Sequence, residues 1–144
     1  MANLVEVKGN LFDSMLLNKE NSMILHCISA DYALGKGFAL EVEKRYHIRD
    51  RLKQIGSYNY PDCLVVDKII NIVTKGAYWT KPTYETFEQA LLLARNFCVS
   101  NNIGILLMPR IGCGLDRLDW KICKSYIYNI LVMSGIDCAV YRLK

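Results

Sequence analysis

Hydrophobic residues along this chain fall into short continuous runs and into longer stretches with helical spacing. The runs at residues 23–28 and 103–108 contain almost no polar residue, a pattern typical of strands buried on both faces of a sheet. The runs at residues 63–66 and 69–73 are separated only by Asp67 and Lys68, which predicts a tight hairpin. Strands are expected at residues 4–7, 23–28, 63–66, 69–73, 103–108 and 138–142.

Further segments carry apolar residues at the spacing of a buried helix face. One begins at the glycines of residues 35–37, one follows Pro82, a residue favoured at helix starts, and one ends at Gly135. Their apolar faces are Phe38, Ala39, Val42 and Tyr46; Phe87, Ala90, Leu91, Ala94 and Cys98; and Trp120, Cys123, Ile127, Ile130 and Leu131. Because strands and helices alternate, we predict an α/β fold with three layers, α/β/α, around a mixed sheet. No repeat or linker interrupts the pattern, so one domain is expected over residues 1–144.

The composition is that of an ordinary globular protein, with 52% of the 144 residues hydrophobic and 22% charged. No apolar run approaches the roughly 18 residues that span a bilayer, and the first residues lack the pattern of a signal peptide. We therefore expect a protein of the cytoplasm or the nucleus, with no membrane partner. The six cysteines form no CxxC pair and the two histidines are isolated, so reduced thiols and no metal site are expected.

The net charge of +4 suits a protein that binds an anion but does not require one. The densest basic stretch, residues 44–53, is interrupted by Asp50 and has a helix-like pattern. A solvated helix face explains this stretch better than a nucleic-acid groove, which needs a longer basic stripe or aromatic platforms. Nucleic acid is therefore the least favoured partner, and a single small domain is expected to be a monomer.

Two loops that contain glycines follow predicted strands. Gly112, Gly114 and then Asp116 follow the run at residues 103–108, and Gly35 and Gly37 follow the run at residues 23–28. In an open α/β sheet, ligands bind just beyond the carboxyl ends of the strands. Glycines allow several backbone N–H groups to approach one anion, and a helix N-terminus adds its positive end. One such loop is often only a turn, but two loops side by side fit a diphosphate.

The residues around these loops resemble those of a known family. The segment RIGCGLDRL at residues 110–118 is similar to the catalytic loop of the terminal ADP-ribose glycohydrolase type of macrodomain. Similar segments occur in the family's order: VKGNLF at residues 7–12, HCIS at 26–29, GKGFA at 35–39, TK at 74–75 and KPTYE at 81–85. The resemblance extends over residues 5–142, so it implies the macrodomain fold for the whole chain and ADP-ribose as its ligand.

The resemblance also implies a nucleophile and an acid–base residue. Lys75 matches the family's catalytic lysine, which attacks the anomeric carbon of the distal ribose and forms a lysyl-ADP-ribose adduct. Asp116 matches the residue that assists ring opening and resolution of the adduct. Without the resemblance, a surface lysine and a carboxylate at a helix N-terminus are the simpler interpretations, and for Asp116 the two roles can hold together. The implied mechanism needs no metal and no other cofactor.

The ligand-binding residues implied by the resemblance include one departure from the family. The family has an aspartate where this chain has Asn10, and that aspartate accepts a hydrogen bond from the adenine amino group. The asparagine carbonyl can accept the same bond without its charge-assisted part. The ligand-binding residues expected are Asn10, Leu11, Ser29, Gly35, Lys36, Gly37, Phe38, Ala39, Arg110, Ile111, Gly112, Cys113, Gly114 and Leu115.

The implied function is hydrolysis of the ester bond between ADP-ribose and acidic (Glu or Asp) side chains of proteins. O-acetyl-ADP-ribose and ADP-ribose 1″-phosphate are alternative substrates, because each carries a good leaving group at or near the anomeric carbon. A reader module that binds ADP-ribose without turnover is the alternative, although Lys75 together with Asp116 favours an enzyme.

Tyr78 and Trp79 stand where the family has shorter, polar residues, and they fit either a gate over the pocket or a surface for a partner. A cysteine nucleophile at Cys113 would need a base that neither histidine supplies.

Overall fold

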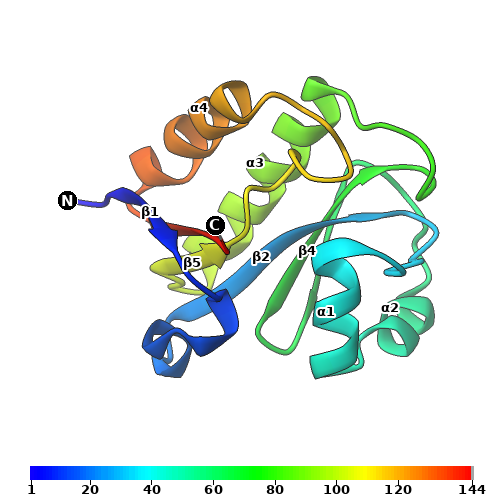
Figure 1. Cartoon of the computed structure of the whole chain (residues 1–144), viewed down its shortest axis with the longest axis horizontal. Coiled ribbons are helices and arrows are strands. Elements are labelled where there is room, and N and C mark those ends of the chain that lie inside the picture. The colour runs from blue at the N-terminus through cyan, green and yellow to red at the C-terminus, as the bar shows by residue number, and fades with distance from the viewer. Residues whose placement is uncertain (144) are drawn as a thin grey trace.

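Six strands form one mixed sheet in the computed structural model, which describes residues 1–143. The order across the sheet is β1-β6-β5-β2-β4-β3 (Figure 1). The strands are β1 (Leu4–Lys8), β2 (Ser22–Ser29), β3 (Asp62–Val66), β4 (Ile69–Lys75), β5 (Ile105–Met108) and β6 (Asp137–Arg142). β3 and β4 are antiparallel and form the predicted hairpin, and the other neighbouring pairs are parallel. Because β2, β4 and β5 run in the same direction, their carboxyl ends lie along one edge of the sheet.

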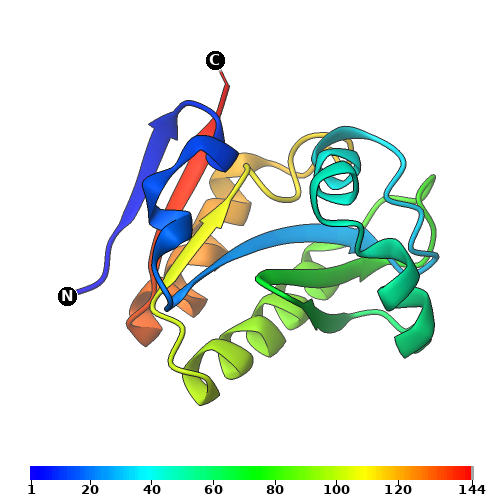
Figure 2. The ribbon, with the colours of Figure 1, turned by 90° about the horizontal axis from the view of Figure 1, so that it is seen from below.

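Helices cover both faces of this sheet (Figure 2). α1 (Gly37–Tyr46) and α2 (Arg49–Ile55) pack on one face, and α3 (Tyr84–Ser100) and α4 (Trp120–Ile130) pack on the other. Short 3-10 helices, which the sequence did not predict, are η1 (Leu11–Asp13), η2 (Met15–Asn18) and η3 (Val132–Ser134). The expected three-layer α/β/α fold is therefore confirmed. None of the helices in residues 1–143 has the length and apolar character needed to cross a bilayer.

Alternate residues of β2 enter two separate hydrophobic cores. Met23 and Leu25 pack with α3 and α4, whereas Ile24 and Ile28 pack with α1 and α2, and none of the four is more than 5% exposed. Burial on both faces explains why this strand is a continuous apolar run. Truncation of such a residue to alanine typically destabilises a protein by about 2–5 kcal/mol.

The basic stretch at residues 44–53 is divided between two helices, although its pattern suggested one. His47 follows α1 in the left-handed region, at φ 53°, and its N–H donates to the carbonyl of Glu43. The next residue, Ile48, is fully buried in the core under α1 and α2. The hydrophobic gain from burying Ile48 offsets the helical hydrogen bonds that are lost at this break.

Two helix ends also differ from their expected positions. α3 begins at Tyr84 because Thr83 is its N-cap, in a capping box with Thr86, so Pro82 lies outside the helix. α4 ends at Ile130, and η3 follows before Gly135, at φ 91°, turns the chain toward β6.

The pairing of β2 with β4 shifts register close to the carboxyl ends of both strands. Ile28 pairs with Val73, but Ser29 pairs with Lys75, so Thr74 is passed over. Beyond this point the N–H of Ala30 donates to the carbonyl of Lys75 at 2.8 Å. Such irregularities bend a strand and are common beside functional sites.

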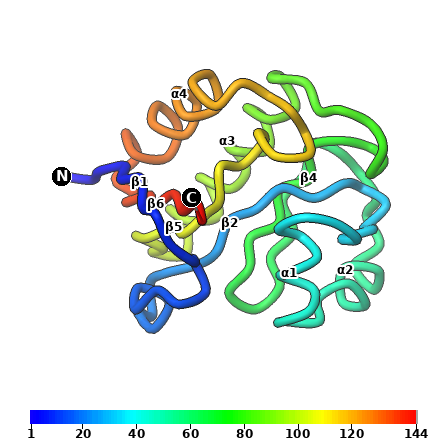
Figure 3. The backbone as a smooth tube through the Cα atoms, viewed as in Figure 1, coloured from blue at the N-terminus to red at the C-terminus, as the bar shows by residue number. Residues whose placement is uncertain are grey.

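The first and last strands lie side by side (Figure 3). Their pairing runs from Leu4 opposite Cys138 to Lys8 opposite Arg142. β6 lies between β5 and β1, so within the described residues β1 is an edge strand that pairs with β6 alone.

Candidate active site

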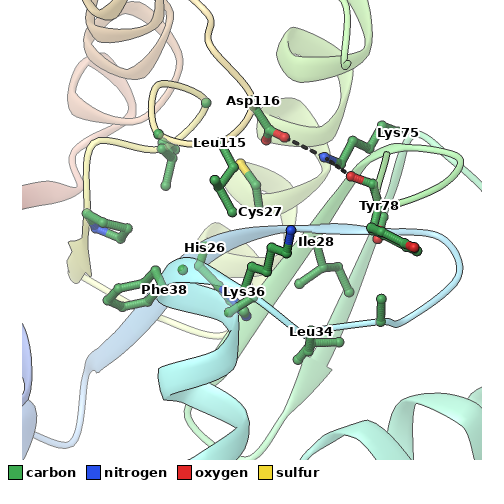
Figure 4. Close-up of a pocket in the computed structure, with 18 of the residues that line it drawn as sticks. His26, Cys27, Ile28, Leu34, Lys36, Phe38, Lys75, Tyr78, Leu115 and Asp116 are labelled. Carbon is green, nitrogen blue, oxygen red and sulfur yellow. Dashed lines mark hydrogen bonds and ion pairs between the residues drawn. The ribbon is translucent and has the colours of Figure 1, made fainter. Parts of the chain in front are cut away.

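A cavity of about 620 Å³ lies at the carboxyl ends of β2, β4 and β5 (Figure 4). Its walls come from the end of β2 and the segment 33–39, from Lys75 and Tyr78, and from the loop that follows β5. This volume falls in the range of small-ligand sites. The residues expected from the sequence that do line it are Ser29, Gly35, Lys36, Gly37, Phe38, Ala39, Lys75, Arg110, Ile111, Gly112, Gly114, Leu115 and Asp116.

The two glycine loops meet across this cavity. Gly37 is the first residue of α1 and has φ 59°, and a Cβ atom there would lie 3.2 Å from Leu115 Cδ1 in the other loop. The N-terminus of α1 has no side-chain cap, because Lys36 at the N-cap makes no such bond. The first N–H groups of the helix can therefore serve an anion in the cavity.

Lys75 and Asp116 form a shielded ion pair at this cavity. Lys75 Nζ donates to Asp116 Oδ1 at 2.7 Å, and the two side chains are only 11% and 14% exposed. Nζ also donates to the backbone carbonyl of Tyr78 at 3.1 Å (Figure 4). The carboxylate offsets the desolvation of the ammonium group, which would be unfavourable without a partner. The structure thus brings together the two residues expected to carry the chemistry.

The simpler interpretation of Asp116, as a carboxylate at a helix N-terminus, is wrong. Asp119 is the N-cap of α4, and its side chain accepts a hydrogen bond from the N–H of Lys121 at 2.9 Å. Asp116 lies in the preceding turn and is bound to Lys75 instead. Its carboxylate is therefore directed at the amine and not at the helix.

Glu6 on β1 anchors the loop that follows β5. Glu6 Oε1 accepts hydrogen bonds from Arg110 Nη2 at 3.0 Å and from Trp120 Nε1 at 3.1 Å. Oε2 accepts from Lys124 Nζ at 2.8 Å. These hydrogen bonds, of which the one from Lys124 has the largest effect, hold the pKa of Glu6 below its ordinary value. One carboxylate thus connects a cavity-lining arginine to β1 and α4.

Asn10, Leu11 and Cys113 were expected to bind ligand, but they do not line the cavity. Asn10 Oδ1 accepts from the N–H of Phe12 at 2.9 Å and caps η1. Leu11 is 3% exposed and belongs to the core under α1 and α2. Cys113 packs against the opposite core, and its thiol donates to the carbonyl of Ile111 at 3.5 Å. The contact of Asn10 with adenine stays a prediction. It requires the side-chain oxygen of Asn10 to accept a second hydrogen bond besides that from Phe12.

His26 is the most informative lining residue that was not expected to bind ligand. Its Nε2 lies 2.6 Å from Asn71 Oδ1, while Asn71 Nδ2 donates to the carbonyl of Leu64 at 2.9 Å. This arrangement assigns the proton to Nε2, because Asn71 presents an oxygen to it. Burial lowers the pKa of His26 to about 4, so the ring is neutral at physiological pH. The sequence feature that could have indicated His26 is its place as a lone polar residue inside an apolar run. A polar side chain buried in this way needs a hydrogen-bond partner.

Tyr78, one of the two aromatic residues considered as a gate, lines the cavity, and Trp79 does not. Other lining residues that the sequence did not assign to the site are Cys27, Ile28, Ala33, Leu34 and Pro109. Most of them are apolar, and apolar strand ends are hard to distinguish from core by sequence alone. The charged lining residues are Lys36, Lys75, Arg110 and Asp116, a surplus of positive charge that suits an anionic ligand. Within residues 1–143, no group of three His, Cys, Asp or Glu side chains is arranged to hold a metal ion.

Solved structures that share this fold include macrodomains. The macrodomain of Thermus aquaticus DarG matches with a TM-score of 0.82 at 19% identity, over 99% of each chain. Thermosipho africanus DarTG in complex with ADP-ribose matches with a TM-score of 0.77 at 18% identity, over 98% of this chain and 42% of that chain. At such low identity these similarities describe the fold only.

Sequence similarity identifies the group of macrodomains to which this chain belongs. ADP-ribose glycohydrolase OARD1 from Homo sapiens and its counterpart from Bos taurus are each 34% identical to this chain over 140 residues. The match covers 95% of this chain and 90% of each relative. No protein-family model matches the sequence. This chain belongs to the macrodomain family, in the group of the ADP-ribose glycohydrolases, which confirms the resemblance seen in its motifs.

Proposed function

We propose that this protein is an ADP-ribose hydrolase that releases ADP-ribose from acidic side chains of proteins. The observation that carries the proposal is the shielded pair of Lys75 and Asp116, whose charged atoms are 2.7 Å apart at the cavity. Membership of the family supports the hydrolase activity, since relatives that match almost the whole chain are named ADP-ribose glycohydrolase. A module that only reads ADP-ribose needs contacts to phosphate and base, but it does not need an amine beside a carboxylate.

The proposed reaction begins with attack of Lys75 Nζ on the anomeric carbon of the distal ribose. A carbon–nitrogen bond forms, and the carboxylate of the modified side chain leaves with the electron pair of the ester bond. Asp116 first takes a proton from the Lys75 ammonium group, which frees the amine for attack. It then gives that proton to the ring oxygen as the ribose opens and takes the second proton from nitrogen as the iminium adduct forms. Water then adds to the iminium carbon, the carbon–nitrogen bond breaks, and ADP-ribose and the free amine are restored.

O-acetyl-ADP-ribose and ADP-ribose 1″-phosphate belong to the same proposal as alternative substrates. Each has a leaving group that departs as a stable anion from the distal ribose. The positive charges of Lys36 and Arg110 at the cavity support binding of such anionic ligands.

Trapping of the lysyl adduct tests the proposal. The intact mass is measured after incubation with ADP-ribose and cyanoborohydride, which reduces the iminium to a stable amine. Wild type is compared with Lys75→Ala and with Lys53→Ala, an exposed lysine at the end of α2 that serves as the matched control. We expect a single ADP-ribose adduct in wild type and in Lys53→Ala, and none in Lys75→Ala.

Turnover of an ADP-ribosylated glutamate peptide is measured on the same variants. Lys75→Ala is expected to lose at least about 100-fold in rate because the nucleophile is absent. If Lys75→Ala turns over the peptide as fast as the wild type does, the lysine mechanism is wrong. Tight ADP-ribose binding by the wild type without turnover of the peptide or of either small substrate identifies a reader instead.

A further inference from the structure

Asp31 connects three segments of the site without lining the cavity itself. Its Oδ1 accepts hydrogen bonds from the hydroxyl of Ser29 at 2.5 Å and from the N–H of Ala33 at 3.1 Å. Its Oδ2 accepts from the N–H of Tyr78 at 3.0 Å. Ser29 is at the end of β2, Ala33 begins the segment that carries the first glycine loop, and Tyr78 is in the turn after β4.

Only part of this arrangement is ordinary turn chemistry. An aspartate that accepts from the N–H two residues later, as Asp31 does from Ala33, is a common local turn. The bond from Tyr78 is different, because it joins residues 47 positions apart and crosses from one strand end to another. A long-range bond of this kind fixes one loop relative to the other.

The bond from Tyr78 matters because the same residue holds the amine of Lys75. Lys75 Nζ has two acceptors, Asp116 Oδ1 at 2.7 Å and the carbonyl of Tyr78 at 3.1 Å. The carbonyl can hold the amine only while the backbone of Tyr78 keeps its orientation. Asp31 restrains that backbone through its N–H, so a continuous path of hydrogen bonds runs from Asp31 through Tyr78 to Lys75.

Asp31 is suited to this task as a carboxylate. Burial opposes its ionisation, but the hydrogen bonds from Ser29, Tyr78 and Ala33 outweigh that effect and hold the pKa of Asp31 below its ordinary value. A carboxylate accepts at both oxygens, whereas an asparagine in the same place accepts at one only. The adjacent register shift, which leaves Ala30 bonded to the carbonyl of Lys75, ties the backbone of the same two segments together.

We infer that Asp31 is a positioning residue, which aligns the amine of Lys75 for attack by holding the backbone of Tyr78. This inference rests on the proposed function, because it acts through Lys75. Nucleophilic attack is sensitive to small displacements, and a misplacement of about 1 Å can slow a reaction by about 100-fold. Binding of ADP-ribose, in contrast, is expected to depend mainly on the glycine loops, which line the cavity.

The test is Asp31→Asn, alone and combined with Lys75→Ala, with Asp62→Asn as the matched control. Asparagine keeps one acceptor oxygen for Ser29 and Ala33 and turns a donor toward the N–H of Tyr78, so that bond is lost. Asp62 likewise accepts from a hydroxyl and a backbone N–H, at 3.0 and 2.7 Å, but it does not line the cavity. Single-turnover rates are measured with an ADP-ribosylated peptide, and ADP-ribose affinity and thermal stability are measured on each variant.

We expect Asp31→Asn to lower the rate by about 10-fold or more, with the dissociation constant for ADP-ribose within about 3-fold of wild type. In the Lys75→Ala background the same change should have no further effect, because there is no amine to align. Asp62→Asn should match wild type in rate.

Three results overturn the inference. An unchanged rate in Asp31→Asn excludes a positioning role, and a parallel loss of rate, affinity and stability identifies a structural residue. An equal rate loss in the Lys75→Ala background shows that Asp31 does not act through the lysine. The proposed function fails separately, and takes the inference with it, if Lys75→Ala turns over as fast as wild type.

Discussion

Two glycines in the loop after β5 show how strongly single residues can differ within one motif. A Cβ atom at Gly112 would lie 3.0 Å from Cys123 Sγ and 3.2 Å from Phe87 Cε1, and the backbone there has φ 81°. A Cβ atom at Gly114 would meet nothing within 4 Å. Only the first glycine is therefore required by both its conformation and its packing.

Alanine substitutions at these two positions should separate in stability. Gly112→Ala is expected to lower the free energy of unfolding by about 2–3 kcal/mol, because strain in the left-handed region adds to overpacking against Cys123 and Phe87. Gly114→Ala is expected to change it by less than about 1 kcal/mol. Urea unfolding of both variants measures the difference, and equal losses would contradict the assignment.

At the residue scale, the sequence predicted the two glycine loops and the meeting of Lys75 with Asp116. It did not predict that Asn10 caps a 3-10 helix or that the thiol of Cys113 turns toward the carbonyl of Ile111. Both outcomes depend on short-range competition for hydrogen bonds, because a nearby backbone group can bind the side chain and keep it from facing the cavity. A motif gives the residue type, but it does not show this competition.

At the scale of elements, the start of α4 sets where the loop after β5 ends. Asp119 caps the helix through the N–H of Lys121, and the N–H of Asp119 itself donates to the hydroxyl of Tyr84 on α3 at 2.9 Å. The cap thus fixes the end of the loop after β5 to both helices of this layer.

Asp119→Ala should remove the cap and lower the free energy of unfolding by about 1 kcal/mol, equivalent to a few degrees in Tm for a domain of this size. Asp13→Ala, which removes an exposed carboxylate that caps no helix, is the control. Differential scanning calorimetry compares the two variants. A loss in Asp119→Ala no larger than that in Asp13→Ala would show that the cap contributes nothing.

The long elements were predictable because their apolar periodicity extends over several turns or over a whole strand. The separation of α2 from α1 and the helices η1 and η2 were not, because they are too short for a periodic signal. η1 and η2 are instead specified by single caps, Asn10 and Ser14, whose side chains accept backbone hydrogen bonds. The break at His47 depends on burial of Ile48, which is a tertiary effect.

At the scale of the whole molecule, the buried His26 links folding to pH. In the folded protein the pKa of His26 is about 4, compared with an ordinary value near 6.5. Below pH 6.5 the unfolded chain therefore binds a proton that the folded protein excludes, and the free energy of unfolding falls as the pH drops toward 4. The full difference corresponds to about 3 kcal/mol.

His26→Gln should remove this part of the acid sensitivity, since glutamine does not titrate and can still donate to Asn71. Urea unfolding at pH 7 and at pH 4.5 gives the loss of stability for each protein. His47→Asn, which replaces the exposed histidine at a left-handed position, is expected to keep the loss seen in wild type. If His26→Gln loses as much stability on acidification as wild type, another group controls the acid response.

The position of β6 between β5 and β1 has a consequence for the order of events during synthesis. Of the strands in residues 1–143, β1 leaves the ribosome first, yet its only partner among them is β6, residues 137–142, which leaves last. Until then β5 and β1 both present open edges, and open edges pair readily with strands of neighbouring nascent chains. A chain that stalls or is truncated before residue 137 therefore has most of its core sequence but two unprotected strand edges, which makes it a substrate for chaperones or a seed for aggregation.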